Sequence, residues 1–313
     1  MRAVGKKLHH FVPRFYLDAW AMEGKVCCLQ SGRVFQPNLR NVAAENHFYR
    51  LQELRPSDIA FVREEVINDS PERLKPTHER LLQQFVTPHA ARAHYQRQSS
   101  VPAGLLAAIN KDIAEANENL HAKIEQSFQP YLERLRSGDL SFLSGDTDGV
   151  LFYHGFAVQY TRTNHRRRVE RMMPAAKRAQ YDRTANIITH MLALNLGYSL
   201  FNAHPRLTIM LMENDTEVPF ITADQPVINI AAKFNDLAAP ATFEGYYPIS
   251  PRKALLILES GSVFLPRTAS VTAIDAHLWN LRIASRAYRQ VFSRSRLELE
   301  AIRTDLPRFI SSL

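Results

Sequence analysis

The amino-acid sequence predicts an α+β fold, with a mainly helical body, a small N-terminal β element and a C-terminal β-sheet closed by a final helix. The central part of the chain carries apolar residues at helical spacing, for example between Leu105 and Leu135. Short apolar runs bounded by turn residues precede and follow this region, as expected for strands. The composition, 45% hydrophobic and 22% charged over 313 residues, is typical of a soluble globular protein with a sizeable core.

The N-terminal region predicts an extended segment followed by a hairpin. His9 and His10 stand before Pro13 in this segment, where adjacent side chains point to opposite faces. The core can therefore hold one histidine while its neighbour faces a cleft. The elements expected next are a short helix or turn at 15–21 and hairpin strands at 26–29 and 33–36.

Five stretches carry the helical pattern: 59–85, 105–135, 149–168, 174–201 and 275–292. The first is interrupted at Ser70, which is well placed to cap a helix that begins at the following proline. The second is expected to be one helix, or two joined near Pro130. Residues 87–102 show no clear apolar period and are expected to form a basic surface connection.

The C-terminal third changes to strands separated by turn residues. The strands are expected at 207–212, 220–222, 227–230 and 255–258. The helix at 275–292 is expected to close the chain. No low-complexity linker or internal repeat interrupts the sequence, so we expect residues 1–313 to form a single integrated domain.

The charge of the chain favours a polyanionic partner. The formal net charge is +8 and the isoelectric point about 9.6, which suits contact with nucleic acid or phosphorylated ligands. The two cysteines, Cys27 and Cys28, are adjacent, which excludes a disulfide framework and a four-cysteine zinc site. No apolar run approaches the ~18 residues that span a bilayer, so we expect a cytoplasmic protein without membrane contact.

One helical segment concentrates polar side chains on a single face. Gln159, Arg162, Thr163 and Arg166 are spaced by three, four and seven positions from the first, so they share one side of a helix. Arginine donates paired hydrogen bonds to phosphate or carboxylate oxygens. This face is therefore a candidate anion-binding surface.

Two further polar positions stand next to strands. Asp224 follows a predicted strand and precedes a proline, a place where a carboxylate can bind a metal, act as a base or orient a histidine. The structural alternative is an Asx turn made by Asp224. Arg252 is a candidate contact to substrate, and its structural alternative is a turn before the strand at 255–258.

The order of these motifs resembles the bacterial DUF4238 family along nearly the whole chain. The residues that carry the resemblance are His9-His10-x-Val12-Pro13-x-x-Tyr16-Leu17, Asn41-Val42-Ala43-x-Glu45 with Phe48-Tyr49, Gln159-x-x-Arg162-Thr163, Ile221-Thr222-Ala223-Asp224-x-Pro226-Val227 and Pro248-Ile249-Ser250-Pro251. The resemblance implies one integrated architecture and the same polar positions, and it implies no reaction. Ala223 stands where serine is expected, and Asn164 where proline is expected.

The leading hypothesis is a phosphodiesterase that cleaves nucleic acid, in bacterial stress or phage defence. His9 or His10 would activate water or a ribose hydroxyl, Asp224 would orient the histidine or hold a divalent metal ion, and Arg162 would stabilise the developing phosphorane charge. Further contacts to the substrate are expected from Tyr16, Gln159, Thr163, Arg166 and Arg252.

Two narrower nuclease hypotheses rest on spacing. The spacing of the histidine pair, Asn38 and His47 resembles that of the active-site residues in a histidine-asparagine-histidine metal nuclease. Arg183 and His190, two helical turns apart, imitate the pair of HEPN-type helical ribonucleases.

The competing hypothesis is a non-catalytic protein that binds nucleic acid or another anion, as a sensor or partner. In that case His10, Tyr16, Arg162 and Asp224 form a buried hydrogen-bonded network that holds the small β element against the helices.

Overall fold

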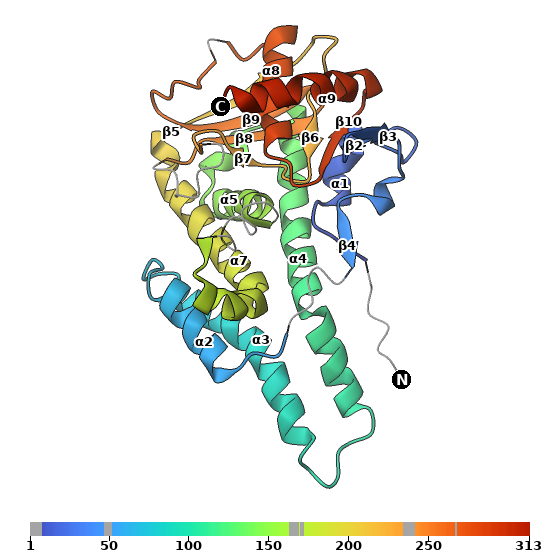
Figure 1. The fold of residues 1–313 in the computed structure, drawn as a ribbon. Helices are drawn as coiled ribbons and strands as arrows, with labels where there is room; N and C mark the ends of the chain where they lie inside the picture. Colours follow the sequence, from blue (N-terminus) through green and yellow to red (C-terminus); the bar gives the residue numbers. More distant parts are fainter. Residues whose placement is uncertain (1–7, 47–51, 163–168, 170–171, 234–241, 267) are drawn as a thin grey trace.

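The computed structural model describes residues 8–46, 52–162, 169, 172–233, 242–266 and 268–313. It is 57% helix and 15% strand, which confirms the α+β class. Figure 1 shows small N-terminal strands on one side of the long helix α4, helices α5 and α7 on its other side, and the C-terminal strands and helices at one end.

The N-terminal region forms short elements around a tight hairpin. They are β1 (Leu8–His10), α1 (Arg14–Leu17), η1 (Asp18–Trp20), β2 (Cys27–Gln30), β3 (Arg33–Phe35), η2 (Leu39–Asn41) and β4 (Ala44–Asn46). The predicted hairpin is confirmed as β2 and β3, and its turn at Ser31 and Gly32 takes up positive φ at both residues. β1 pairs antiparallel with β4.

The body consists of helices, one of them 33 residues long. They are α2 (Pro56–Val62), the π-helical η3 (Arg63–Ile67), α3 (Lys75–Tyr95), α4 (Leu105–Ser137), η4 (Ser141–Ser144), α5 (Asp146–Tyr160) and α7 (Ala175–Ala203). α3 and the first half of α4 form a helical hairpin that projects from the rest of the molecule (Figure 1). α4 continues through Pro130 as one helix. Of the two possibilities predicted for this region, one helix or two, the first is therefore correct.

The C-terminal part contains η6 (His204–Arg206), strands β5 to β10 and two helices. The bounds are β5 (Leu207–Glu213), β6 (Thr222–Ala223), β7 (Ile228–Asn229), β8 (Gly245–Ser250), β9 (Lys253–Glu259), α8 (Ala273–Ser285), β10 (Gln290–Ser293) and α9 (Arg296–Ser311). One sheet has the order β5-β9-β8-β7, and a second has the order β3-β2-β10-β6. The second sheet joins the N-terminal hairpin to the end of the chain.

The main apolar core draws on the whole length of the chain. It includes Phe11 near the N-terminus, Phe128 of α4, Phe152 of α5, Tyr247 of β8 and Phe292 of β10. Burial of such large side chains is the dominant favourable contribution to folding. This shared core favours the single-domain organisation, which stays a prediction.

Three expectations about elements were wrong, and each was overridden by tertiary contacts. Ser70 caps no helix; its hydroxyl donates to the carbonyl of Val66 at 2.7 Å, and α3 begins at Lys75. α3 continues through 87–95, because it packs along α4. The helix predicted over 275–292 ends at Ser285, and residues 290–293 instead pair with β2 and β6.

Two glycines let α5 approach its neighbours closely. A Cβ at Gly155 of α5 would lie 2.2 Å from the ring of Phe128 on α4. A Cβ at Gly197 of α7 would lie 2.9 Å from the backbone of His154 on α5. Both distances are below any real contact, so α4, α5 and α7 can pack in this way only with glycine at these positions.

We expect Gly155→Ala to destabilise the protein. Overpacking against Phe128 costs about 1–3 kcal/mol, and this exceeds the gain of up to about 1 kcal/mol from replacing a helical glycine. Urea denaturation measures the free energy of unfolding. The matched control is Gly145→Ala, whose Cβ would find no neighbour closer than 3.6 Å. Equal or greater stability of Gly155→Ala would contradict the proposed helix contact.

Candidate functional site

The histidine pair is held by a short two-stranded ladder. His9 lies opposite Glu45 and His10 opposite Ala44, because β1 runs antiparallel to β4. Adjacent side chains on a strand point to opposite faces. His9 is 6% exposed and His10 is half-buried.

The His10 imidazole is oriented and neutral. Its Nδ1 lies 3.1 Å from the carbonyl oxygen of Val42, so Nδ1 carries the proton and donates, and Nε2 keeps the acceptor lone pair. Burial is the main cause that lowers the pKa of His10, and the charges of Arg14 and Arg162 lower it further. The Val42 bond and the charge of Glu125 oppose the shift. A neutral imidazole with a directed lone pair can accept a proton.

Helix α4 supplies two carboxylates to this region. Glu118 Oε2 lies 3.7 Å from His9 Nε2, and Glu125 Oε1 lies 2.6 Å from Arg162 Nη2. The two glutamates are seven residues apart, which is two helical turns, so they share one face of α4. Both are about one-quarter exposed, so solvent reaches the group from this side.

Arg162 stands in a wide π-helical turn directly after α5 and is 2% exposed. One turn earlier, the amide of Gln159 is 1% exposed, and neither its oxygen nor its nitrogen has a hydrogen-bond partner in the part of the chain that the structure describes. A buried amide without partners costs about 1–3 kcal/mol, which favours a role in binding a ligand. Thr163 and Arg166 lie outside the described residues.

A second group of buried histidines lies between α4, α5 and α7. His190 Nε2 lies 2.8 Å from Asn117 Oδ1, and its ring lies 4.3 Å from the ring of His121. Burial lowers the pKa of His190 to about 3 and that of His154 to about 4, so both are neutral at physiological pH. The charge of Arg162 also acts on His190, which places this group beside the site.

Sequence reasoning missed Asn117, Glu118, His121 and Glu125. The sequence does contain a pattern that points to them, because polar residues interrupt an apolar pattern at positions 117, 121 and 125, each one helical turn apart. Such a polar stripe also fits a solvated face of a helix. Only the packing of α5 and α7 against α4 showed that Asn117 and His121 are buried.

Asp224 has structural contacts of its own. Its carboxylate accepts hydrogen bonds from the backbone nitrogens of Tyr288, Arg289 and Gln290 at 2.7, 2.7 and 2.9 Å. Burial raises its pKa to about 6, although these three bonds favour the charged form. The bonds order the turn that leads into β10, and they occupy both oxygens. Among the described residues, the Asp224 carboxylate is thus hydrogen-bonded to this turn and not to the histidine pair.

The side chains of Tyr16 and Arg252 also form hydrogen bonds within the protein. Tyr16 is completely buried; its hydroxyl donates to the carbonyl of Pro248 at 2.6 Å and lies 2.6 Å from Thr222 Oγ1. Arg252 donates to the carbonyls of Asn214 and Thr216 and lines a separate cavity of about 560 Å³. Neither arrangement presents the side chain to the group around Arg162.

The two narrower nuclease hypotheses find no further support. Arg183 forms two hydrogen bonds with buried Asp58, at 2.8 and 2.6 Å, whereas His190 pairs with Asn117. Asn38 accepts a hydrogen bond from the backbone of Arg40 and caps a short helix. His47 lies outside the residues that the structure describes.

Within the described ranges, no three histidine, cysteine, aspartate or glutamate side chains are arranged to hold a metal ion. In the same ranges, no helix is both long and apolar enough to cross a bilayer. Cys27 and Cys28 are both buried and free.

Comparison with known proteins gives one match. The sequence model of a family described as "Protein of unknown function (DUF4238)" matches residues 8–296. No curated protein and no solved structure shows significant similarity to the chain.

We expect Asp224→Asn to lower the stability of the protein by at least about 2 kcal/mol at neutral pH. An amide cannot accept all three backbone bonds, and its own N–H groups would face backbone donors. Urea denaturation provides the measurement, with exposed Asp215→Asn as the matched control. If both variants were as stable as the original protein, the assigned contacts of Asp224 would be wrong.

We expect buried His190 to make stability fall on acidification. Its folded pKa is about 3 against 6.5 in the unfolded chain, so between these values the unfolded state binds more protons, and unfolding becomes easier as pH falls. His190 then contributes a loss of about 1.4 kcal/mol per pH unit below 6.5. Asp224 acts in the opposite direction, because its folded pKa is raised.

The measurement is the free energy of unfolding against pH for the original protein and for His190→Gln. Asp224 is common to both, so the difference between the two curves isolates His190. We expect the variant to show the shallower loss on acidification. Parallel curves would mean that His190 is not buried and neutral in the folded protein.

Proposed function

Because the chain belongs to the DUF4238 family, whose description assigns no function, we propose its function from the site itself: a nucleic-acid phosphodiesterase centred on His10 and Arg162. The observation that carries the proposal is an oriented, neutral imidazole that lies within electrostatic reach of a buried guanidinium. A proton acceptor next to a fixed positive charge is what attack on a phosphodiester requires.

The roles follow from the hydrogen bonds of each group. The Val42 carbonyl fixes Nδ1 of His10 as a donor, so Nε2 takes the proton from water or from a ribose hydroxyl. Arg162 stabilises the additional negative charge on the phosphoryl oxygens. Glu125 holds the Arg162 guanidinium in place through the 2.6 Å contact and is a positioning residue.

Gln159 contributes a binding group to the same site. Its buried amide can donate to a phosphate oxygen and accept from a hydroxyl or a base. The +8 net charge would supply affinity for the polyanionic backbone and a strong dependence on salt. Asp224 is left out of the proposed machinery, because backbone donors occupy its oxygens.

A second candidate is a non-catalytic protein that binds nucleic acid or another anion. The 2% exposure of Arg162 and its pairing with Glu125 favour this candidate, because buried ion pairs often hold elements together. In this case the polar group fastens β1 and α5 to α4. Loss of Arg162 would then unfold the protein by leaving Glu125 without its partner.

The test is cleavage of labelled tRNA, single-stranded DNA and duplex DNA by the purified protein, with magnesium, manganese or a chelator. We expect His10→Ala to reduce the rate about 100-fold or more, because a general base contributes about 10²–10⁴-fold. The melting temperature is expected to change little, since His10 is only half-buried.

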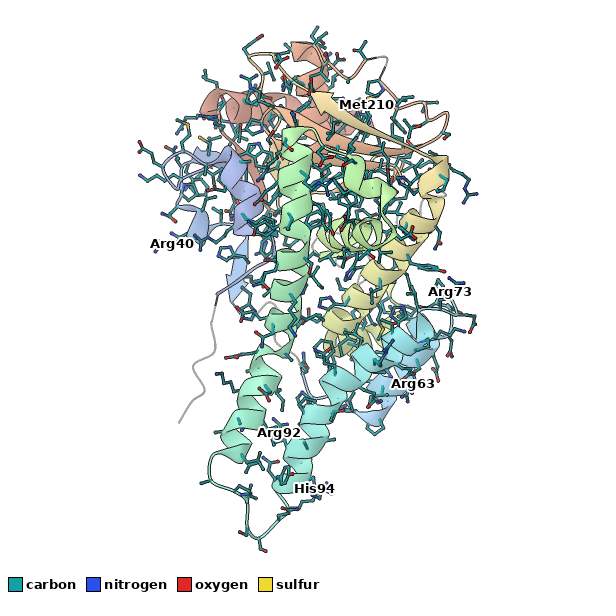
Figure 2. The ribbon with its side chains drawn as sticks, turned by 180° about the vertical axis from the view of Figure 1, so that it is seen from behind. Arg40, Arg63, Arg73, Arg92, His94 and Met210 are labelled. Carbon is teal, nitrogen blue, oxygen red and sulfur yellow. The ribbon has the colours of Figure 1, made fainter. Side chains whose placement is uncertain are left out.

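The matched control is His94→Ala. His94 is exposed near the end of the projecting hairpin (Figure 2), where its Nε2 contacts the amide of Gln98. This variant is expected to cleave like the original protein. Failure of the original protein to cleave any substrate, together with a large loss of melting temperature in Arg162→Ala, would favour the non-catalytic candidate.

A further inference from the structure

We propose that a cavity beside α8 binds a small monocarboxylate with an apolar or aromatic body. Helix α8, which supplies part of the cavity wall, lies at the end of the molecule opposite the projecting α3–α4 hairpin (Figure 1). The cavity shares no lining residue with the proposed nuclease site. Its volume is about 380 Å³, within the ~300–1,000 Å³ typical of small-molecule sites.

Apolar side chains form about half of the cavity wall. Val263 and Phe264 come from the segment before α8, and Leu278 and Trp279 come from α8 itself. Val263 is 91% exposed and Leu278 is 45% exposed. Large apolar side chains that surround a concave surface favour a ligand with an apolar body.

Arg282 supplies the positive charge among the described residues that line this cavity. Its guanidinium carbon lies 5.4 Å from the ring centre of Phe264 and 5.5 Å from that of Trp279. In the described part of the chain this guanidinium has no acceptor for its N–H groups and no carboxylate partner, and burial lowers its pKa. A partly desolvated guanidinium that lacks an acceptor is a strong site for a carboxylate.

Asp275 limits the charge that the ligand can carry. It lines the cavity, but its Oδ2 already accepts from the nitrogen and hydroxyl of Thr272, the N-cap residue of α8, at 3.0 and 2.7 Å in a capping box. A negative charge held there opposes a doubly charged phosphate more than a singly charged carboxylate. One arginine and one fixed aspartate therefore favour a monoanion.

Contacts with the rest of the protein hold parts of both cavity walls in place. Trp279 stacks on the fully buried Tyr246, with ring centres 4.5 Å apart. The other wall is tied to β5, because Glu213 donates its backbone N–H to Ala269 and accepts from Val271. A preformed site loses little conformational entropy on binding.

The test is titration of the purified protein with 3-phenylpropanoate and, separately, with the neutral 3-phenylpropanamide, followed by tryptophan fluorescence. The two probes differ in charge and share the same body. We expect saturable binding of the carboxylate with a dissociation constant of about 1 mM, and binding of the amide about tenfold weaker. Inorganic phosphate is expected to compete poorly.

Variants assign the charge effect to one residue. Arg282→Gln is expected to weaken carboxylate binding about tenfold and to leave the amide unchanged. Arg296→Gln is the control, since Arg296 is 64% exposed on α9. Equal binding of the two probes by the original protein would overturn the proposal even if Arg282→Gln did not fold. So would the absence of saturation up to about 20 mM.

Discussion

The close approach of α5 to both α4 and α7 is the constraint on which the site depends. Gly155 and Gly197 leave no room for a side chain between these helices. This packing brings Arg162, just beyond the end of α5, within 2.6 Å of Glu125 on α4. It also places His154 close enough to His190 to affect its pKa. The chemistry of the site therefore rests on two positions that carry no functional group.

Burial gives the polar groups their properties. A guanidinium that is 2% exposed requires a fixed partner, and Glu125 supplies one while keeping contact with solvent. The same low polarity keeps His10, His154 and His190 neutral. The charged Arg162 thus lies near imidazoles that can accept protons. This combination suits both proton transfer and binding of an anion.

Polar contacts join residues near the N-terminus to residues in the C-terminal part, far away in the sequence. The Tyr16 hydroxyl donates to the carbonyl of Pro248, and the side-chain oxygen of Gln290 accepts from the backbone nitrogen of Ala43. Asp224 accepts hydrogen bonds from the turn before β10. β10 in turn lies between β2 of the N-terminal hairpin and β6. The histidine pair is consequently supported by residues from both ends of the chain. Substitutions far from β1 can affect its position.

The sequence by itself determined the α+β class, the long helices, the hairpin at β2 and β3, and the position of the histidine pair on an extended segment. These features depend on local periodicity and turn residues, which the sequence displays directly. The tertiary structure alone decided that residues 290–293 form a strand and that Asn117 and His121 are buried. It also decided that Glu125 pairs with Arg162, and that Asp224 forms hydrogen bonds with the turn before β10. Each of these outcomes depends on partners distant in sequence, and local patterns carry no information about which distant group will supply the hydrogen bond or the covering side chain.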